Sequence, residues 1–140
     1  MGDPDVPDVD ELSVAEKIMH ALKGDGPIRM RLIRDRIRVV WAAVLCSPKM
    51  TAQDAEVISA MRDVDPEVLR EIGKQREWRR QRVAICVNLA MNPVTPQDIA
   101  VSVLPQLSEA DLARVIESDA LSSHVRGAAK EVRETRIKPK

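Results

Sequence analysis

The sequence predicts an all-α domain made of two three-helix units of about 44–45 residues with capping helices at the ends. Two observations support this fold class. Apolar residues recur at helical spacing between capping residues and helix-ending prolines. These punctuation signals also repeat in the same order, because Ser47-Pro48 corresponds to Asn92-Pro93 and Thr51 to Thr95 at intervals of 45 and 44 residues.

The first expected helices follow from their start and stop signals. Ser13 and Glu16 form a capping box that opens a helix, and Gly24 ends it in a left-handed conformation. Pro27 starts the longest helix, about residues 28–46, since proline is tolerated in a first turn. The apolar stripe of this helix consists of Met30, Ile33, Ile37, Val40, Trp41 and Val44.

Two short helices are expected next. Thr51 caps the first of them, with Asp54 in its first turn. Asp65-Pro66 opens the second, and Gly73 ends it. Together with the long helix before them, they make up the first three-helix unit.

The same order of signals then recurs. A second long helix is expected at about residues 76–91, and Thr95 and Ser108 open two short helices. Pro105 predicts that the first of these kinks or ends early. A third long helix is expected at about residues 123–136.

Composition bounds the possible functions. The 140 residues suit one domain, and 44% of them are hydrophobic, which is enough for a core. The chain has no Phe or Tyr and only 5 Gly, which argues against base-stacking platforms and phosphate-cradling loops. The longest apolar run, residues 39–46, is too short to span a membrane, and the N-terminus has no signal-peptide pattern. A cytoplasmic protein is therefore expected.

Charge is distributed unevenly along the chain although the formal net charge is zero. Residues 1–17 carry six carboxylates against one lysine, and residues 125–140 carry six bases against two carboxylates. We expect residues 1–12 to form a disordered acidic tail, residues 13–136 the single helical domain, and residues 137–140 a basic C-terminal tail.

Three segments carry a resemblance: the Asn-Pro-Val-Thr-Pro turn at 92–96, the segment 104–112, and the helix start around His124-Val125-Arg126 with Ala129. With them the chain resembles HEAT/armadillo-like α-helical repeat proteins of a short bacterial type, over about residues 27–136. The resemblance implies a right-handed stack of helices that serves as a binding scaffold and has no catalytic residues.

Motifs for catalysis or metal binding are not found in the sequence. His20 and His124 are far apart, and neither belongs to a cluster with metal-ligand spacing. Cys46 and Cys86 lie in apolar patterns and are expected to be buried thiols. Most carboxylates occur in caps, first turns or charged helix faces, where they have structural roles. We therefore expect no enzyme activity, no catalytic residue, no metal site and no cofactor.

Arginines offer the one candidate binding surface. Three of them are spaced i, i+3, i+7 on the first expected long helix, and two on the second long helix correspond to them at an interval of 45 residues. In a stack, equivalent residues share one surface, so the two rows would merge into a basic strip. The candidate partner-binding residues are Arg31, Arg34, Arg38, Arg76, Arg79 and Arg80.

Two interpretations of these arginines remain open. Carboxylates of the preceding short helices could pair with the second row, namely Asp63, Asp65, Glu67 and Glu71. Alternatively, the strip binds an acidic or helical segment of another protein, which would make the chain a non-catalytic adaptor or scaffold. Nucleic-acid phosphates are the second candidate partner, self-association through an uncovered end of the stack is a third, and no membrane partner is expected. Trp41 and Trp78 are expected in the core.

Overall fold

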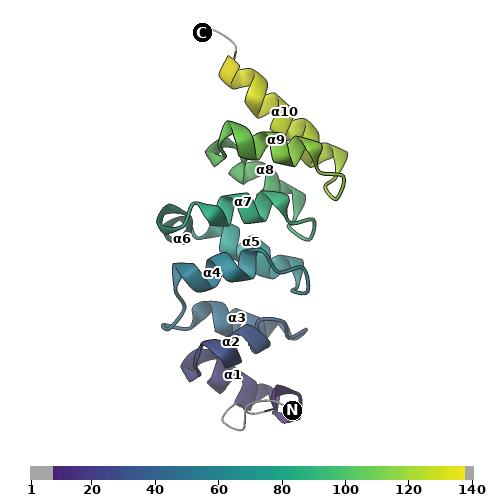
Figure 1. The fold of residues 1–140 in the computed structure, drawn as a ribbon. Helices are drawn as coiled ribbons and strands as arrows, with labels where there is room; N and C mark the ends of the chain where they lie inside the picture. The colour runs from purple at the N-terminus through teal and green to yellow at the C-terminus, as the bar shows by residue number, and fades with distance from the viewer. Residues whose placement is uncertain (1–7, 138–140) are drawn as a thin grey trace.

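The computed structural model describes residues 8–137, and every regular element in this range is a helix (Figure 1). The expected all-α class is confirmed. The remaining parts of the expected tails, residues 1–7 and 138–140, lie outside the described residues. In chain order the elements are η1 (Val9–Glu11), α1 (Val14–Lys23), α2 (Gly26–Leu32), α3 (Arg38–Cys46), α4 (Ala52–Ser59), α5 (Pro66–Lys74), α6 (Arg76–Gln81), α7 (Ala84–Met91), α8 (Gln97–Val103), η2 (Leu104–Gln106), α9 (Glu109–Glu117) and α10 (Ser123–Ile137).

The helices follow one another along a single long axis, so that η1 and the C-terminal end of α10 lie at opposite ends of an elongated column (Figure 1). Helix α1 packs against α3, α4 against α7, and both α8 and α9 against α10. One continuous cluster of buried apolar side chains runs from Ala21 in α1 to Ala129 in α10. Removal of this apolar surface from water, at about 25 cal/mol per Å², is the main force that holds the column together.

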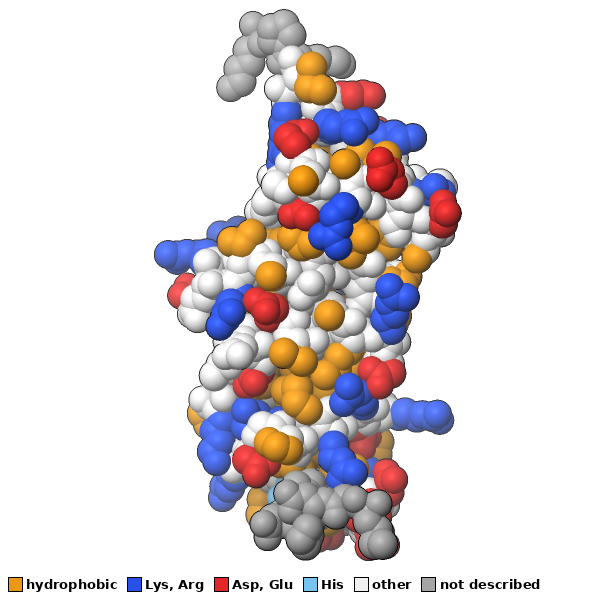
Figure 2. Space-filling model, viewed as in Figure 1, with side chains coloured by type: hydrophobic (Ala, Val, Ile, Leu, Met, Phe, Trp, Pro, Cys, Tyr) orange, Lys and Arg blue, Asp and Glu red, His pale blue; other side chains and the backbone are white. Residues whose placement is uncertain are grey.

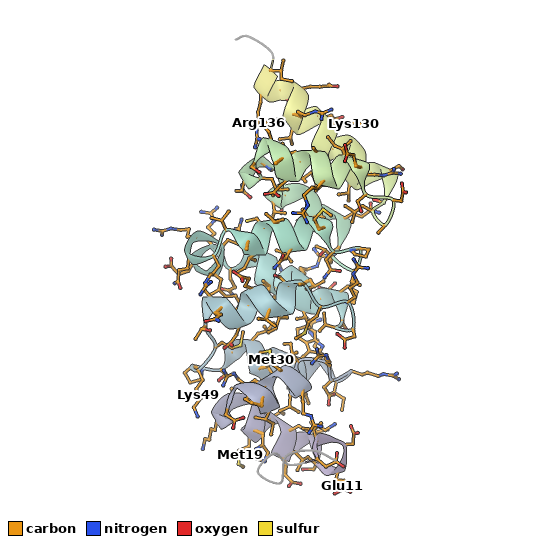
Figure 3. All side chains as sticks on the ribbon, in the orientation of Figure 1. Glu11, Met19, Met30, Lys49, Lys130 and Arg136 are labelled. Carbon is orange, nitrogen blue, oxygen red and sulfur yellow. The ribbon has the colours of Figure 1, made fainter. Side chains whose placement is uncertain are left out.

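The ends of the column have different anchors. At the N-terminal end, where Glu11 and Met19 are labelled, the η1 residue Val9 packs against the core (Figure 3). At the opposite end, Arg136 of α10 donates hydrogen bonds of 2.8 Å to a Glu109 carboxylate oxygen and of 2.8 Å to the Pro105 carbonyl (Figure 3). Ordered structure thus begins before residue 13 and continues through Ile137.

Helix starts were predicted well where the capping residue is local. Ser13 accepts from the Glu16 N–H and the Glu16 carboxylate accepts from the Ser13 N–H, each at 3.2 Å. Thr51 and Asp54 form the same reciprocal pair at the start of α4. Asp65 accepts from the N–H of Glu67 at the start of α5. These bonds satisfy donors that have no partner within the helix.

The start of α8 differs from the prediction. Its N-cap residue is Pro96, and the hydroxyl of Thr95 is buried with no hydrogen-bond partner among the described residues. Thr95 is therefore not the cap that its correspondence with Thr51 suggested. The expected early end is confirmed, since α8 stops at Val103 and Pro105 lies in the 3₁₀ turn η2.

The first expected long helix, residues 28–46, is divided into α2 and α3. The chain leaves the helical conformation at residues 33–37. Asp35 explains the break, because its carboxylate accepts hydrogen bonds from the Ile37 N–H and from Lys17 Nζ, both at 2.8 Å. A side chain that binds a nearby backbone N–H competes with continuation of the helix.

The second expected long helix, residues 76–91, is likewise divided into α6 and α7 around residue 82. Ile37 and Arg82, which correspond at the interval of 45 residues, thus both lie at breaks. Ile37 is 40% exposed and does not belong to the buried stripe, and Arg82 pairs with Glu56 at 3.7 Å. The prediction of two continuous long helices is therefore wrong.

Two glycines have roles other than those expected. Gly24 is not left-handed, since its φ is −71° and its ψ is 170°. A Cβ atom there would collide with the Ile28 side chain and the His20 carbonyl oxygen. Gly73 does not end α5 but lies inside it, where a Cβ would come within 2.5 Å of Ile99 Cγ2 on α8. Both residues therefore serve close packing.

Ser47 and Asn92, 45 residues apart, make equivalent contacts after α3 and α7. The Ser47 hydroxyl donates to the Leu22 carbonyl at 2.9 Å and accepts from the Lys49 N–H. The Asn92 amide donates to the Ser59 carbonyl at 3.0 Å and accepts from the Val94 N–H. In each case one polar side chain joins the end of a helix to the end of the helix packed beside it, α1 or α4.

Candidate functional site

A cavity of about 580 Å³ lies between α6, α7 and η2. Its rim reaches the surface, since Arg76, Arg80 and Val83 are all exposed. The α6 flank projects sideways from the column, and Lys and Arg side chains stand out on this flank in Figure 2. We call this feature the arginine cavity; its lining residues are Arg76, Arg79, Arg80, Val83, Cys86 and Gln106.

Helix α6 brings the three arginines together because they are close in sequence on one short helix that lies at the surface. It has no buried residue, and Trp78 is its main apolar anchor. Arg76, Arg79 and Arg80 therefore come from consecutive turns of a helix that lies on the surface. The chain leaves the helical conformation at Arg82, and this break allows α6 to project from the column. Helix α7 remains buried through Ile85 and Leu89.

Arg79 is the innermost of the three arginines. It is only partly exposed, and its Nε is buried without a hydrogen-bond acceptor among the described residues. Its guanidinium lies beside the Cys86 thiol. Burial raises the pKa of Cys86, and the neighbouring Arg79 charge only partly offsets this effect. The thiol is therefore protonated at neutral pH and contributes a neutral wall, not a nucleophile.

The residue at position 86 is small compared with the residue at the corresponding position of α3. Cys86 corresponds to Trp41 of α3 at the interval of 45 residues. Trp41 is 1% exposed and lines a smaller cavity of about 260 Å³, whose wall also includes Arg38 and Trp78. A thiol is far smaller than an indole ring, so Cys86 occupies less space beside α7 than Trp41 does beside α3.

The remaining predicted arginines lie elsewhere. Arg31 is exposed in the last turn of α2. Arg34 follows α2 and pairs with Asp63 at 2.7 Å. Arg38 begins α3, with its guanidinium carbon 5.2 Å from the centre of the Trp41 ring, a cation–π distance. The expectation that these three share one helix face is wrong, because the break at residues 33–37 separates them.

The internal ion pairs expected for the second row are not those that the structure contains. Asp63 pairs with Arg34, Glu67 with Arg70 at 3.0 Å, and Glu71 with Lys74 at 3.6 Å. Within residues 8–137, Arg76 and Arg79 take part in no ion pair. The third arginine of the cavity, Arg80, pairs only with Glu77 of the same helix, at 3.4 Å and largely in solvent.

The other sequence expectations have mixed outcomes. Trp41 is in the core as predicted, and Trp78 is partly buried against it. Cys86 is buried as predicted, but Cys46 is exposed because it lies at the last position of α3, at the edge of the smaller cavity. In the described part of the chain, no group of three or more His, Cys, Asp or Glu side chains is arranged to hold a metal ion. None of the helices described is long and apolar enough to cross a bilayer.

Three residues of the arginine cavity were not singled out as site residues from the sequence. Cys86 and Val83 could have been found, because the interval of 45 residues aligns them with Trp41 and Arg38. Gln106 could not, because it reaches the cavity only through the packing of η2 against α7.

In comparisons with known protein families, curated proteins and solved structures, none matches the chain.

Proposed function

We propose that the protein is a non-catalytic interaction module, a short right-handed stack of three-helix repeats that holds an acidic segment of a partner protein on the arginine-bearing flank of α6. The observation that carries the proposal is the arginine cavity. Three guanidinium groups line it, and the carboxylates expected to neutralise them pair with other residues or cap α5. Arginine is well suited to bind carboxylates through its planar, bidentate donor geometry.

The order of helix contacts supports a stack of repeats. The pairs α1–α3, α4–α7 and α8–α10 succeed one another along the column. Ser47 and Asn92 make matching contacts in the first two of these pairs. We therefore divide the chain into three units of three helices, with α6 inserted into the second, instead of two units with capping helices.

A protein partner is favoured over nucleic acid by the distribution of charge. A phosphate-binding surface needs a continuous basic area, and its affinity comes from several phosphate contacts. On the face in Figure 2, basic and acidic side chains alternate, and Arg34, Arg70 and Arg136 are each paired with carboxylates. A small basic site on a chain of zero net charge is better matched to a short acidic segment.

Affinity capture with immobilised protein tests the proposal. The test variant carries Arg76→Glu, Arg79→Glu and Arg80→Glu, and a variant with Arg114→Glu, which leaves the cavity lining unchanged, is the matched control. We expect proteins captured by the wild type and the control to be lost from the triple variant, with unchanged helical circular dichroism. Equal capture by all three would refute the proposal, and retardation of duplex DNA at low salt by the wild type alone would favour nucleic acid.

A further inference from the structure

We infer that the arginine cavity receives two side chains of an extended partner segment that are two residues apart and therefore on the same side of it, an acidic one that pairs with Arg79 and an apolar one that packs against Val83 and Cys86. This inference rests on the proposed function and specifies the chemistry of the partner. It follows from three features of the cavity: an unpartnered buried donor, a neutral apolar wall, and a volume larger than one side chain.

The unpartnered donor is Arg79 Nε. It is buried, and the described residues offer it no acceptor. A buried donor without a partner costs about 1–3 kcal/mol, and hydrogen bonds to charged acceptors are the stronger kind. A carboxylate that enters the cavity would pair with the Arg79 guanidinium, which lines the cavity beside the Cys86 thiol. The neighbouring Arg76 and Arg80 add positive charge at the rim and draw an anion toward it.

The apolar wall comes from α7 and the residue before it. Val83 is 59% exposed and lines the cavity, so its apolar surface is accessible to a ligand. The Cys86 thiol is neutral, because burial raises its pKa. A purely anionic ligand, such as inorganic phosphate, would leave this wall in contact with water. An apolar side chain next to the carboxylate would cover it and gain about 25 cal/mol per Å² of apolar surface.

The volume and the polar group opposite fit a peptide. A cavity of about 580 Å³ is large enough to hold more than one amino-acid side chain. Gln106 of η2 also lines the cavity, and an amide side chain can both donate to and accept from a peptide backbone. An extended segment in which an acidic and an apolar residue are two positions apart therefore matches all the chemical groups of the lining.

Fluorescence anisotropy with synthetic peptides tests the inference. The probe, called the Glu-Leu peptide, is a fluorescein-labelled peptide of Glu-Ser-Leu-Ser repeats, in which Glu and Leu lie on the same side of an extended chain. In the comparison peptides, Ser replaces every Leu (the Glu-Ser peptide) or Lys replaces every Glu. We expect the Glu-Leu peptide to bind at least about tenfold more tightly than either comparison peptide. No binding of the Glu-Leu peptide, or equal binding of the Glu-Ser peptide, would overturn the inference.

Variants locate the binding. Arg79→Gln removes the charge and Cys86→Trp fills the cavity with the side chain that stands at the equivalent position 41. Each should weaken binding of the Glu-Leu peptide at least about tenfold, while Arg114→Gln leaves it unchanged. Cys86→Leu provides a smaller filling residue if Cys86→Trp lowers the helical circular dichroism. Wild-type affinity in Arg79→Gln, or in a folded Cys86 variant, would overturn the inference.

The two proposals can fail separately. If the triple arginine variant loses partner capture but a folded Cys86 variant binds the Glu-Leu peptide like the wild type, the flank binds a partner and the cavity does not receive its side chains. If capture by the triple variant is unchanged, the proposed function itself fails.

Discussion

Arg29 of α2 and Asp54 of α4 form an ion pair of 3.0 Å that connects the first two helical layers inside the protein. The Arg29 side chain is 6% exposed and also donates to the Gly24 carbonyl at 2.9 Å. The same Asp54 oxygen accepts from the Thr51 N–H, so the capping box of α4 and the ion pair share one carboxylate.

Replacing Arg29 with Met should destabilise the protein by about 2–4 kcal/mol, because it leaves a partly buried carboxylate and a carbonyl without their donor. Urea unfolding followed by circular dichroism measures the loss. Glu77→Gln, which breaks the exposed pair with Arg80, is the control and should cost less than about 0.5 kcal/mol. Equal losses in the free energy of unfolding for the two substitutions would contradict a stabilising role of the Arg29–Asp54 pair.

The contacts of Ser47 and Asn92 lead to a second prediction. Asn92→Ala should cost about 2–3 kcal/mol, because it leaves the carbonyls of Ser59 and Met61 without a donor in a buried region. Ser47→Ala removes one such bond and should cost about 1–2 kcal/mol. Chemical denaturation of both variants checks the values. A neutral Asn92→Ala substitution would contradict the role given to this side chain.

Two helical glycines should respond in opposite directions to the same substitution. Gly73→Ala forces a methyl group against Ile99 and should destabilise by about 1–3 kcal/mol. Gly127 of α10 has open space within 4 Å of the position of a Cβ, so Gly127→Ala should stabilise by about 0.5–1 kcal/mol. Thermal unfolding of the pair measures both signs, and stabilisation by Gly73→Ala would contradict the close approach of α5 to α8.

Asp35 should make stability depend on acid pH. Partial burial raises the pKa of Asp35. The hydrogen bonds from Lys17 and from the Ile37 N–H together lower it by more than burial raises it, so the pKa lies below its ordinary value. A group with a lowered folded pKa stabilises the protein above its unfolded pKa of about 3.9, and this stabilisation is lost as the pH falls through the folded pKa.

Asp35→Asn should therefore be less stable than the wild type at neutral pH and should lose less stability between about pH 5 and pH 2. Urea unfolding over this pH range gives both curves. Lys17→Met removes the partner and should produce a similar flattening. Parallel curves for wild type and Asp35→Asn would contradict the role of the ion pair.

The parts of the fold that were predictable depend on short-range chemistry. Caps such as Ser13, Thr51 and Asp65 bind N–H groups two or three residues away, so their sequence pattern is sufficient to locate a helix start. The helix break at residues 33–37 could not be located in this way, because Asp35 is held there by Lys17, 18 residues earlier. The role of Gly73 likewise depends on Ile99 of another helix.

The candidate site was predictable to a similar degree. Arg76, Arg79 and Arg80 are all on α6 and line one cavity, and their sequence spacing alone places them within about a turn and a half of a helix. The expected basic strip that joins these arginines to Arg34 and Arg38 required one unbroken helix at residues 28–46. That prediction is wrong because the segment is divided into α2 and α3. The cavity itself could not be located from the sequence, because Gln106 reaches it only through the packing of η2 against α7.

Hydrogen exchange in the presence of the Glu-Leu peptide tests the central claim most directly, because it reports where a partner segment binds. The account predicts slower amide exchange in residues 76–86, which form α6 and the start of α7, and unchanged exchange in α10. Protection that is confined to other helices, or no change in any segment at a saturating peptide concentration, would contradict it.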